Sequence, residues 1–260
     1  MSKVEVYIPT RNSERTIEKC LRSIFSAIPD ASVTLVDRYS TDRTVEEARK
    51  FGAKVIQGDL NLGRARELMC ESAQDEWFVM VDSDTYLKPD WYEKISSFRN
   101  SVDDGSLGII QGLNEPMYER YRSWWQQQIR KIQFPQINPG RVLTCNVLIR
   151  TKAVRGFKCD LPVYEDYALT NYVREKGFKS WVTDKARAYH DNPTLESKDA
   201  RWGGAGAVYT GAIPLWKFFV GIFYGGLLKT EWGWKWYSAK LYWNWFVGGL
   251  FKSKYLEAKK

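Results

Sequence analysis

The sequence is poor in histidine and cysteine, the residues that most often build zinc sites and disulfide scaffolds. It has 260 residues with a single histidine, and its four cysteines lie far apart with no CxxC pair: Cys20, Cys70, Cys145 and Cys159. This pattern argues against a disulfide framework or structural zinc and favours reduced thiols in a cytosolic setting. The first residues also lack an apolar stretch of signal-peptide length, so we expect no export.

Positive charge exceeds negative charge, and nearly all of the excess lies at one end of the chain. The net charge is +8, and residues 201–260 hold nine Lys and Arg against two Glu, together with seven of the twelve tryptophans. The first 200 residues are therefore close to neutral, which argues against a general nucleic-acid-binding surface. A basic segment rich in tryptophan instead favours contact with anionic lipid.

Short apolar runs alternate with helical patterns up to about residue 200, which is typical of βαβ units and a largely parallel sheet. The expected strands are 4–8, 33–37, 53–57, 76–81, 107–113, 142–149, 178–182 and 186–189. The expected helices are 14–27 with Ser13 as its cap, 40–51, 63–73, one opening at Pro89, 116–131 and 165–176, with a loop over 135–140. We predict an α/β fold in which helices flank a mainly parallel, Rossmann-like central sheet over residues 1–200.

Two carboxylates, Asp82 and Asp84, follow directly after the buried strand expected at 76–81. In open α/β sheets, ligands bind at the carboxyl ends of strands. An Asp-x-Asp there can hold a hard divalent cation that grips a diphosphate. Taken alone the pattern is weak, because an acidic turn after a strand is common.

Three further motifs precede Asp82-Ser83-Asp84 along the chain. They are Pro9-Thr10-Arg11-Asn12, Asp37-Arg38-Tyr39-Ser40-Thr41-Asp42 and Asn61-Leu62-Gly63-Arg64-Ala65-Arg66. In this order, over residues 3–192, the chain resembles the family-2 inverting glycosyltransferases of the GT-A fold. The resemblance implies a nucleotide-sugar-binding half at 1–115 and an acceptor-binding half at 116–200.

The resemblance also implies roles for matching residues on the donor side. Pro9, Thr10, Asn12 and Asp37 would frame the nucleobase and ribose, Arg64 or Arg66 would face the donor, and Asp82 and Ser83 would contact it beside Asp84, the principal metal ligand. The departure is Arg38-Tyr39, where the commoner pattern has Asp-Gly. Because this turn frames the base, the donor could be a UDP- or a GDP-sugar. Asp37 alone could equally be a turn-forming aspartate.

On the acceptor side, Glu165 and Asp166 open the helix expected at 165–176. Acidic residues stabilise helix N-termini in any protein, so one of them could be a cap. The resemblance implies that Asp166 takes the proton from the acceptor hydroxyl and that Glu165 contacts the acceptor. It also places His190 near the metal or the leaving diphosphate, although a single histidine is more often structural. Arg201-Trp202, which follows in the sequence, could close over that diphosphate.

These roles imply one displacement that inverts the anomeric configuration, with Mn²⁺ or Mg²⁺ neutralising the leaving diphosphate and Asp166 as general base. A lipid phosphate acceptor is already ionised and needs no base. The rivals are a sugar-phosphate nucleotidyltransferase, which would need a Gly-rich phosphate loop after the first strand, and a non-catalytic nucleotide-sugar sensor, which would be expected to lose one of the acidic pairs.

The tail, residues 201–260, reads as amphipathic helices. Residues 211–228 are apolar but interrupted by Pro214 and Lys217, so they fall short of the roughly 20 residues of a spanning helix. One aromatic face is expected at Trp216, Phe219, Phe223 and Leu227, and another at Trp234, Tyr237, Leu241 and Trp245. We expect interfacial attachment to the cytoplasmic face of the cell membrane and a lipid-linked or glycan acceptor there. The alternatives are packing on the catalytic domain, a single span or a re-entrant hairpin.

Overall fold

The computed structural model describes residues 3–118, 122, 125, 126, 128–191, 197–222 and 235–253. The chain divides into two units, one of Met1–Asp160 with Asp166–Asn192 and one of Leu161–Glu165 with Pro193–Lys260. The sequence places this division near residue 200. Each unit is described by itself.

Nine strands of the described chain form one sheet in the first unit, in the order β3-β2-β1-β4-β8-β6-β9-β5, with β7 paired to β9. The strands are β1 Val4–Thr10, β2 Ala31–Asp37, β3 Lys54–Gln57, β4 Trp77–Val81, β5 Thr85–Leu87, β6 Leu107–Pro116, β7 Gln136–Ile137, β8 Asn146–Arg150 and β9 Lys179–His190. Pairing is parallel from β3 to β4 and between β6 and β9, and antiparallel at β4–β8, β6–β8, β5–β9 and β7–β9. The predicted α/β class is confirmed, with parallel pairing throughout the first half and mixed pairing beyond β4.

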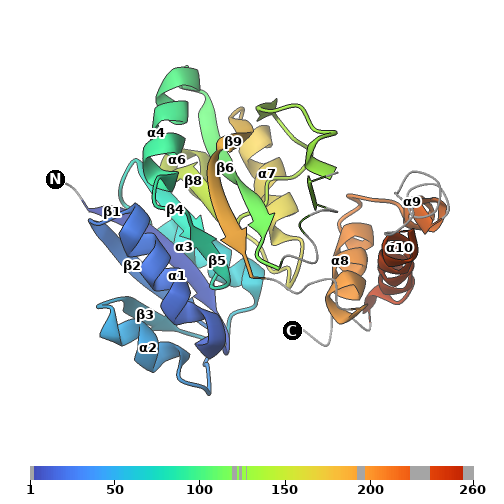
Figure 1. The fold of residues 1–260 in the computed structure, drawn as a ribbon, viewed down its shortest axis with the longest axis horizontal. Helices are drawn as coiled ribbons and strands as arrows, with labels where there is room; N and C mark the ends of the chain where they lie inside the picture. The colour runs from blue at the N-terminus through green and yellow to red at the C-terminus, as the bar shows by residue number, and fades with distance from the viewer. Residues whose placement is uncertain are drawn as a thin grey trace. The chain divides into compact units, whose positions relative to one another are not determined.

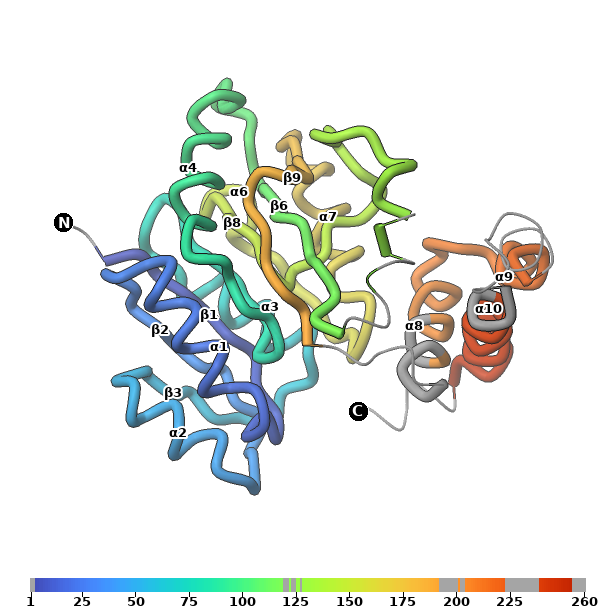
Figure 2. Tube along the Cα trace, viewed as in Figure 1, coloured from blue at the N-terminus to red at the C-terminus, as the bar shows by residue number. Residues whose placement is uncertain are grey.

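Helices cover both faces of this sheet (Figure 1). In the first unit they are α1 Glu14–Ala27, α2 Thr44–Lys50, α3 Leu62–Ser72, α4 Trp91–Val102, α6 Thr151–Val154 and α7 Glu165–Glu175. Helices α1 and α4 lie on one face, and α3, α6 and α7 lie on the other (Figure 1). The tube view shows β9 running beside β6 (Figure 2), and β5, labelled in Figure 1, pairs with β9 on its other side.

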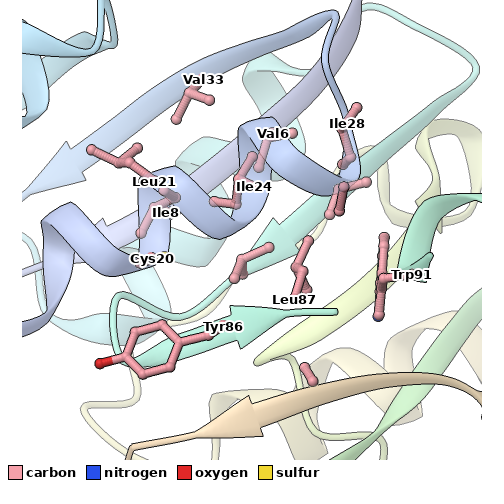
Figure 3. Close-up of a cluster of buried hydrophobic side chains, with 14 of the residues drawn as sticks. Val6, Ile8, Cys20, Leu21, Ile24, Ile28, Val33, Tyr86, Leu87 and Trp91 are labelled. Atoms are coloured by element: carbon pink, nitrogen blue, oxygen red, sulfur yellow. The ribbon is translucent and has the colours of Figure 1, made fainter. Parts of the chain in front are cut away.

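The apolar periodicity of α1 builds the core on the first of these faces. Ile17, Leu21 and Ile24 recur at helical spacing and are fully buried. They pack against Val6 and Ile8 of β1 in one cluster that also contains Tyr86, Leu87 and Trp91 (Figure 3). This packing fixes the loop between β1 and α1, and so positions the edge where β1 ends.

The start of α1 is capped differently from the prediction. Ser13 is the N-cap residue, but its side chain makes no capping bond. Asp42 Oδ2 accepts from the Glu14 amide at 3.0 Å, and Thr44 Oγ1 accepts from the Ser13 amide at 2.7 Å. The turn before α2 therefore supplies the cap of α1, which ties the two loops together.

Several other predicted boundaries were wrong. Helix α4 begins at Trp91 after Asp90, not at Pro89, and the loop at 135–140 contains β7. The two strands expected at 178–182 and 186–189 form one strand, β9, with a shift in register beyond Thr183. The strand expected at 142–149 begins at Asn146, and β5 and α6 are additional. Much of the helix expected at 116–131 lies outside the described residues, and Pro116 itself ends β6.

In the second unit, α8 Ser197–Tyr209, α9 Leu215–Gly221 and α10 Lys235–Leu250 pack together. Glycines allow the close approach of α8 and α10, because a Cβ at Gly204 would meet the Trp245 carbonyl and one at Gly248 would meet the Arg201 carbonyl. Arg201 Nε donates to Asn244 Oδ1 at 3.1 Å, and Asn244 is buried. Helices α8 and α10 are thus joined by the Arg201–Asn244 hydrogen bond, beside the glycines that let their backbones approach.

The predicted aromatic faces of the tail are only partly recovered. Trp216 and Phe219 are exposed on α9, whereas Phe223, Leu227 and Trp234 lie outside the described residues. Leu241 is buried and Trp245 packs against Phe218, so this second face points into the unit. Among the described helices, none is both long and apolar enough to cross a membrane.

Candidate active site

Strands β1, β2 and β4 run parallel, so their carboxyl ends meet at one edge of the sheet. Thr10 and Asp37 are register partners at the ends of β1 and β2, and the Thr10 hydroxyl donates to Asp37 Oδ1 at 2.9 Å. Pro9 lies within β1, opposite Val36. The family resemblance implied that Pro9, Thr10 and Asp37 would lie near one another, and the strand register places Thr10 opposite Asp37.

Asp37 is fully buried, and both of its carboxylate oxygens accept hydrogen bonds from the protein. Oδ1 accepts from the hydroxyls of Thr10 and Ser40, and Oδ2 accepts from the Ser40 amide at 2.9 Å and from Gln57 Nε2 at 3.0 Å. A nucleotide could reach these oxygens only if a protein donor moved. Asp37 organises its own turn through these bonds, and its contact with a nucleotide stays a prediction. Gln57 carried no sequence signal.

The loop after β1 is held to the turn after β2. Asn12 has a positive φ of 51°, and its Oδ1 accepts from the Thr41 amide at 2.9 Å. The Asn12 amide donates to Ser40 Oγ at 2.8 Å. These bonds shape a paired-turn surface at the carboxyl edge.

The two candidate arginines of α3 have different partners. Arg66 is 1% exposed and forms an ion pair with Asp82 Oδ1. Arg64 lies 3.3 Å from Asp160 and 3.2 Å from Glu67. Arg66 is thus the arginine that reaches the acidic motif, because it lies on the buried side of α3.

Asp84 and His190 come together although they lie far apart in the sequence. Asp84 Oδ1 lies 3.3 Å from His190 Nε2, because β5, which follows Asp84, pairs with the end of β9. Burial alone would lower the pKa of His190, but the hydrogen bond and charge of Asp84 outweigh it and raise that pKa. The same contact holds the pKa of Asp84 below its usual value, against the effect of burial. Ser83, between the two aspartates, lies 2.9 Å from Ser13 through their hydroxyls.

The end of β9 is anchored beside this pair. The Asp191 amide donates to the Asp84 carbonyl at 2.8 Å. Asp191 Oδ2 accepts from the Tyr86 hydroxyl at 2.7 Å and from Arg15 Nη1 at 3.0 Å. Asp191 and Tyr86, which the sequence did not single out, therefore fix the strand end that carries His190.

Asp166 lies at the start of α7 and is 5% exposed. The Arg141 guanidinium contacts both carboxylate oxygens: Nε donates to Oδ1 at 2.8 Å, and Nη2 lies 2.8 Å from Oδ2. The Tyr167 amide also donates to Oδ1, at 2.8 Å. Glu165 is buried too, at 6% exposed. Arg141 belongs to none of the recognised motifs, so sequence reasoning missed it.

A short segment links Asp166 to the acidic motif. The Thr170 hydroxyl, bonded to the Asp166 carbonyl at 2.7 Å, accepts from the Val142 amide at 3.0 Å. Three residues further, the Cys145 carbonyl accepts from the Asp82 amide at 3.1 Å. Three extended residues span at most about 11 Å. The helix that carries the predicted base and the acidic motif are therefore linked through one short run of the chain.

Residues 5–161, more than half of the chain, match the model of Glycosyl transferase family 2. The chain belongs to glycosyl transferase family 2. The predicted family and the transferase class of its relatives are thereby confirmed.

Among relatives of this family-2 chain is the poly(ribitol-phosphate) beta-N-acetylglucosaminyltransferase TarS of Staphylococcus aureus, 32% identical over 125 residues, which cover 44% of this chain and 22% of TarS. Another is the poly(ribitol-phosphate) beta-glucosyltransferase of Bacillus spizizenii, 29% identical over 127 residues, covering 43% and 20%. The chain thus spans about a fifth of the length of these two curated relatives.

Solved structures of the family share the fold. Glucosyl-3-phosphoglycerate synthase from Mycobacterium tuberculosis, in complex with phosphoglyceric acid, superposes with a TM-score of 0.59 at 16% identity, covering 82% of this chain and 81% of that one. Residues 1–349 of S. aureus TarS superpose with a TM-score of 0.57 at 18% identity, covering 97% and 92%. These likenesses confirm the GT-A arrangement of sheet and helices.

Proposed function

We propose that the chain transfers a sugar from a UDP- or GDP-sugar to a lipid-linked or membrane-proximal glycan acceptor, with inversion at the anomeric carbon. The observation that carries the proposal is the convergence of Asp84 and His190 at the carboxyl edge, where the loops after β1 and β2 also meet. The M. tuberculosis synthase has been solved with Mn²⁺ and uridine diphosphate, which supports a metal-bound nucleotide donor here.

The residues at this edge fit a divalent cation. The side chains of Asp84 and His190 are 30% and 27% exposed. A carboxylate oxygen suits Mn²⁺ or Mg²⁺, and a neutral imidazole nitrogen is a common metal ligand. Asp82 is turned to Arg66, and among the described residues no third carboxylate, thiol or imidazole completes a cluster. We therefore assign the cation to Asp84 and His190. Asp82 is paired with Arg66 and does not bind the cation directly. Oxygens of the nucleotide-sugar diphosphate and water would complete the coordination shell. Bound there, the metal would supply Lewis-acid stabilisation of the diphosphate.

Asp166 takes the proton of the acceptor hydroxyl in this proposal. Its Oδ1 already accepts from Arg141 and from the Tyr167 amide, so Oδ2 has the lone pair that remains for the acceptor. Arg141 holds the carboxylate in position, and Glu165 precedes it on the same turn. The acceptor oxygen then attacks the face of the sugar opposite the diphosphate.

The exposed aromatic face of the second unit supports attachment to a membrane surface. Trp216 is 61%, Phe219 47% and Trp243 50% exposed. Phe246 joins the two helices, with its ring centroid 5.5 Å from that of Phe219 and 6.0 Å from that of Trp243. Exposed lysines lie on the same helices at positions 217 and 240. Tryptophan with lysine is typical of helices lying in an anionic interface, which would place the protein on the cytoplasmic face of the cell membrane.

The decisive experiment incubates the full chain with Mn²⁺ and a panel of UDP- and GDP-sugars and measures release of the free nucleoside diphosphate. We expect Asp84→Ala and His190→Ala to abolish the metal-dependent release, and Asp30→Asn, a change of an exposed aspartate in a turn, to leave it unchanged. A wild type that binds donors without turnover in the presence of lipid acceptors would instead identify a nucleotide-sugar sensor.

The Arg141–Asp166 ion pair favours the variant of the reaction in which the acceptor is a hydroxyl group that needs a base. A polyprenyl-phosphate acceptor is already ionised and needs no base. The rate of transfer to it would therefore not depend on the Asp166 carboxylate. Asp166→Asn separates the two cases. A loss of about 10²–10⁴-fold in turnover indicates a hydroxyl acceptor, whereas a mild effect indicates a phosphate acceptor.

A further inference from the structure

Tyr39 occupies a backbone conformation that a residue with a side chain rarely adopts. It lies in the turn after β2, where the commoner family pattern has glycine, with a φ of 42°. A positive φ costs free energy in a bulky residue, and such strain is concentrated at functional sites. Tyr39 is also 59% exposed, so burial of its ring does not offset the cost.

The turn around Tyr39 is fixed on both sides. The Arg38 amide donates to the Thr10 carbonyl at 2.9 Å, and the Ser40 amide donates to Asp37 Oδ2 at 2.9 Å. Within the described residues, no hydrogen bond or ring contact engages the Tyr39 side chain itself. The structure therefore holds an uncommitted aromatic ring on a rigid turn, at the edge where β1 and β2 end.

We propose that Tyr39 is the stacking platform for the nucleobase of the donor, an inference that rests on the proposed function. Asp37 beside it has both oxygens occupied by protein donors, so it is poorly placed to read the hydrogen-bonding edge of a base. Stacking on an aromatic ring needs no such edge, because every base has a π-face. Base affinity in this chain accordingly comes from stacking, and it extends to uracil and guanine alike.

The test is calorimetric titration of the full chain with UDP, GDP and inorganic pyrophosphate, each with Mn²⁺. Stacking predicts that Tyr39→Ala weakens UDP and GDP binding roughly tenfold, which is about 1.4 kcal/mol. Tyr39→Phe should retain the wild-type affinity. Pyrophosphate has no base, so its affinity should be the same in all three proteins. Tyr209→Ala, at a tyrosine of similar exposure on α8, serves as the matched control.

Tyr39→Gly distinguishes binding from a role in folding. Glycine relieves the positive φ, so the thermal unfolding midpoint should stay level or rise, while UDP affinity falls as in Tyr39→Ala. The inference is overturned if Tyr39→Ala and Tyr39→Gly bind UDP like the wild type, or if they lose affinity for pyrophosphate to the same extent as for UDP. A wild type that binds neither UDP nor GDP would overturn the proposed donor class, and this inference with it.

Discussion

Asp37 and Asp166 are both buried carboxylates whose oxygens are held by the protein, but their surroundings differ. Asp37 receives neutral donors from hydroxyl, amide and backbone groups, whereas Asp166 receives the charged guanidinium of Arg141. Neutral donors at every position suit a structural role. The Arg141 guanidinium leaves one lone pair of Asp166 Oδ2 open, which suits a carboxylate that contacts a substrate.

Arg141 should therefore matter for turnover more than for donor binding. We expect Arg141→Ala to lower kcat about 10²-fold through misplacement of Asp166, with the KM for the nucleotide sugar nearly unchanged. Steady-state kinetics would measure both, and added guanidinium ion should restore part of the rate. Arg49→Ala, at an exposed arginine of α2, provides the control. A raised donor KM with normal kcat would show that Arg141 serves the donor instead.

The loop before Asp166 is tied to α3 by a second set of charges. Glu67 lies 3.0 Å from Lys158 Nζ and 3.2 Å from Arg64 Nη1, and it accepts from the Cys159 amide at 3.1 Å. Burial raises the pKa of Glu67, but these donors outweigh it and hold that pKa below the usual value. Helix α3 thus connects Arg66, which reaches the acidic motif, with the segment leading to α7.

The contacts of Glu67 should make part of the free energy of unfolding sensitive to acid. Because the pKa of Glu67 is lower in the folded state, its contribution is complete above the unfolded value of about 4.5 and is lost as the pH falls through the folded pKa. We expect Glu67→Gln to cost roughly 1–3 kcal/mol at pH 7 and progressively less below pH 4.5. Thermal unfolding of both proteins from pH 7 to pH 3 measures this, and a constant difference would contradict it.

Helices α8 and α10 depend on glycine for their contact. Gly204→Val would place a branched side chain against the Trp245 carbonyl, which is backbone and cannot turn away. We expect a loss of about 1–3 kcal/mol, seen in hydrogen exchange as faster exchange in α8 and α10 with unchanged protection in β1 and β2. Gly140→Ala, which adds a Cβ in open space, should have little effect. Equal loss of protection in both units would refute this assignment.

Local sequence patterns predicted well those elements whose structure depends on residues close together in the sequence. The spacing of Ile17, Leu21 and Ile24 predicted α1, whereas the family resemblance, not a local pattern, grouped Thr10 with Asp37. The contacts of Arg141 and His190 could not be predicted in this way. Arg141 meets Asp166 only because the loop after β7 returns over α7, and His190 meets Asp84 only because β5 pairs with β9. Neither pairing leaves a periodic signal.

For the complete protein, the exposed aromatic face of α9 and α10 should govern attachment to lipid. We expect the full chain to sediment with vesicles containing anionic lipid, more weakly as salt rises, and the triple variant Trp216→Ser, Phe219→Ser, Trp243→Ser to remain in solution. Ile137→Ser, at a residue 51% exposed in the first unit, is the matched control. Equal sedimentation of wild type and triple variant would contradict the interfacial assignment.

The position of β9 has a consequence for how the enzyme matures. Among the described strands, β9 comes last in the sequence, yet it sits inside the sheet, between β6 and β5. A nascent polypeptide can assemble β1 to β4 from nearby segments while synthesis continues, because those contacts are comparatively local. Asp84 and His190 meet only when the strand bearing His190 inserts, so the proposed cation site is completed at the final step of building the sheet.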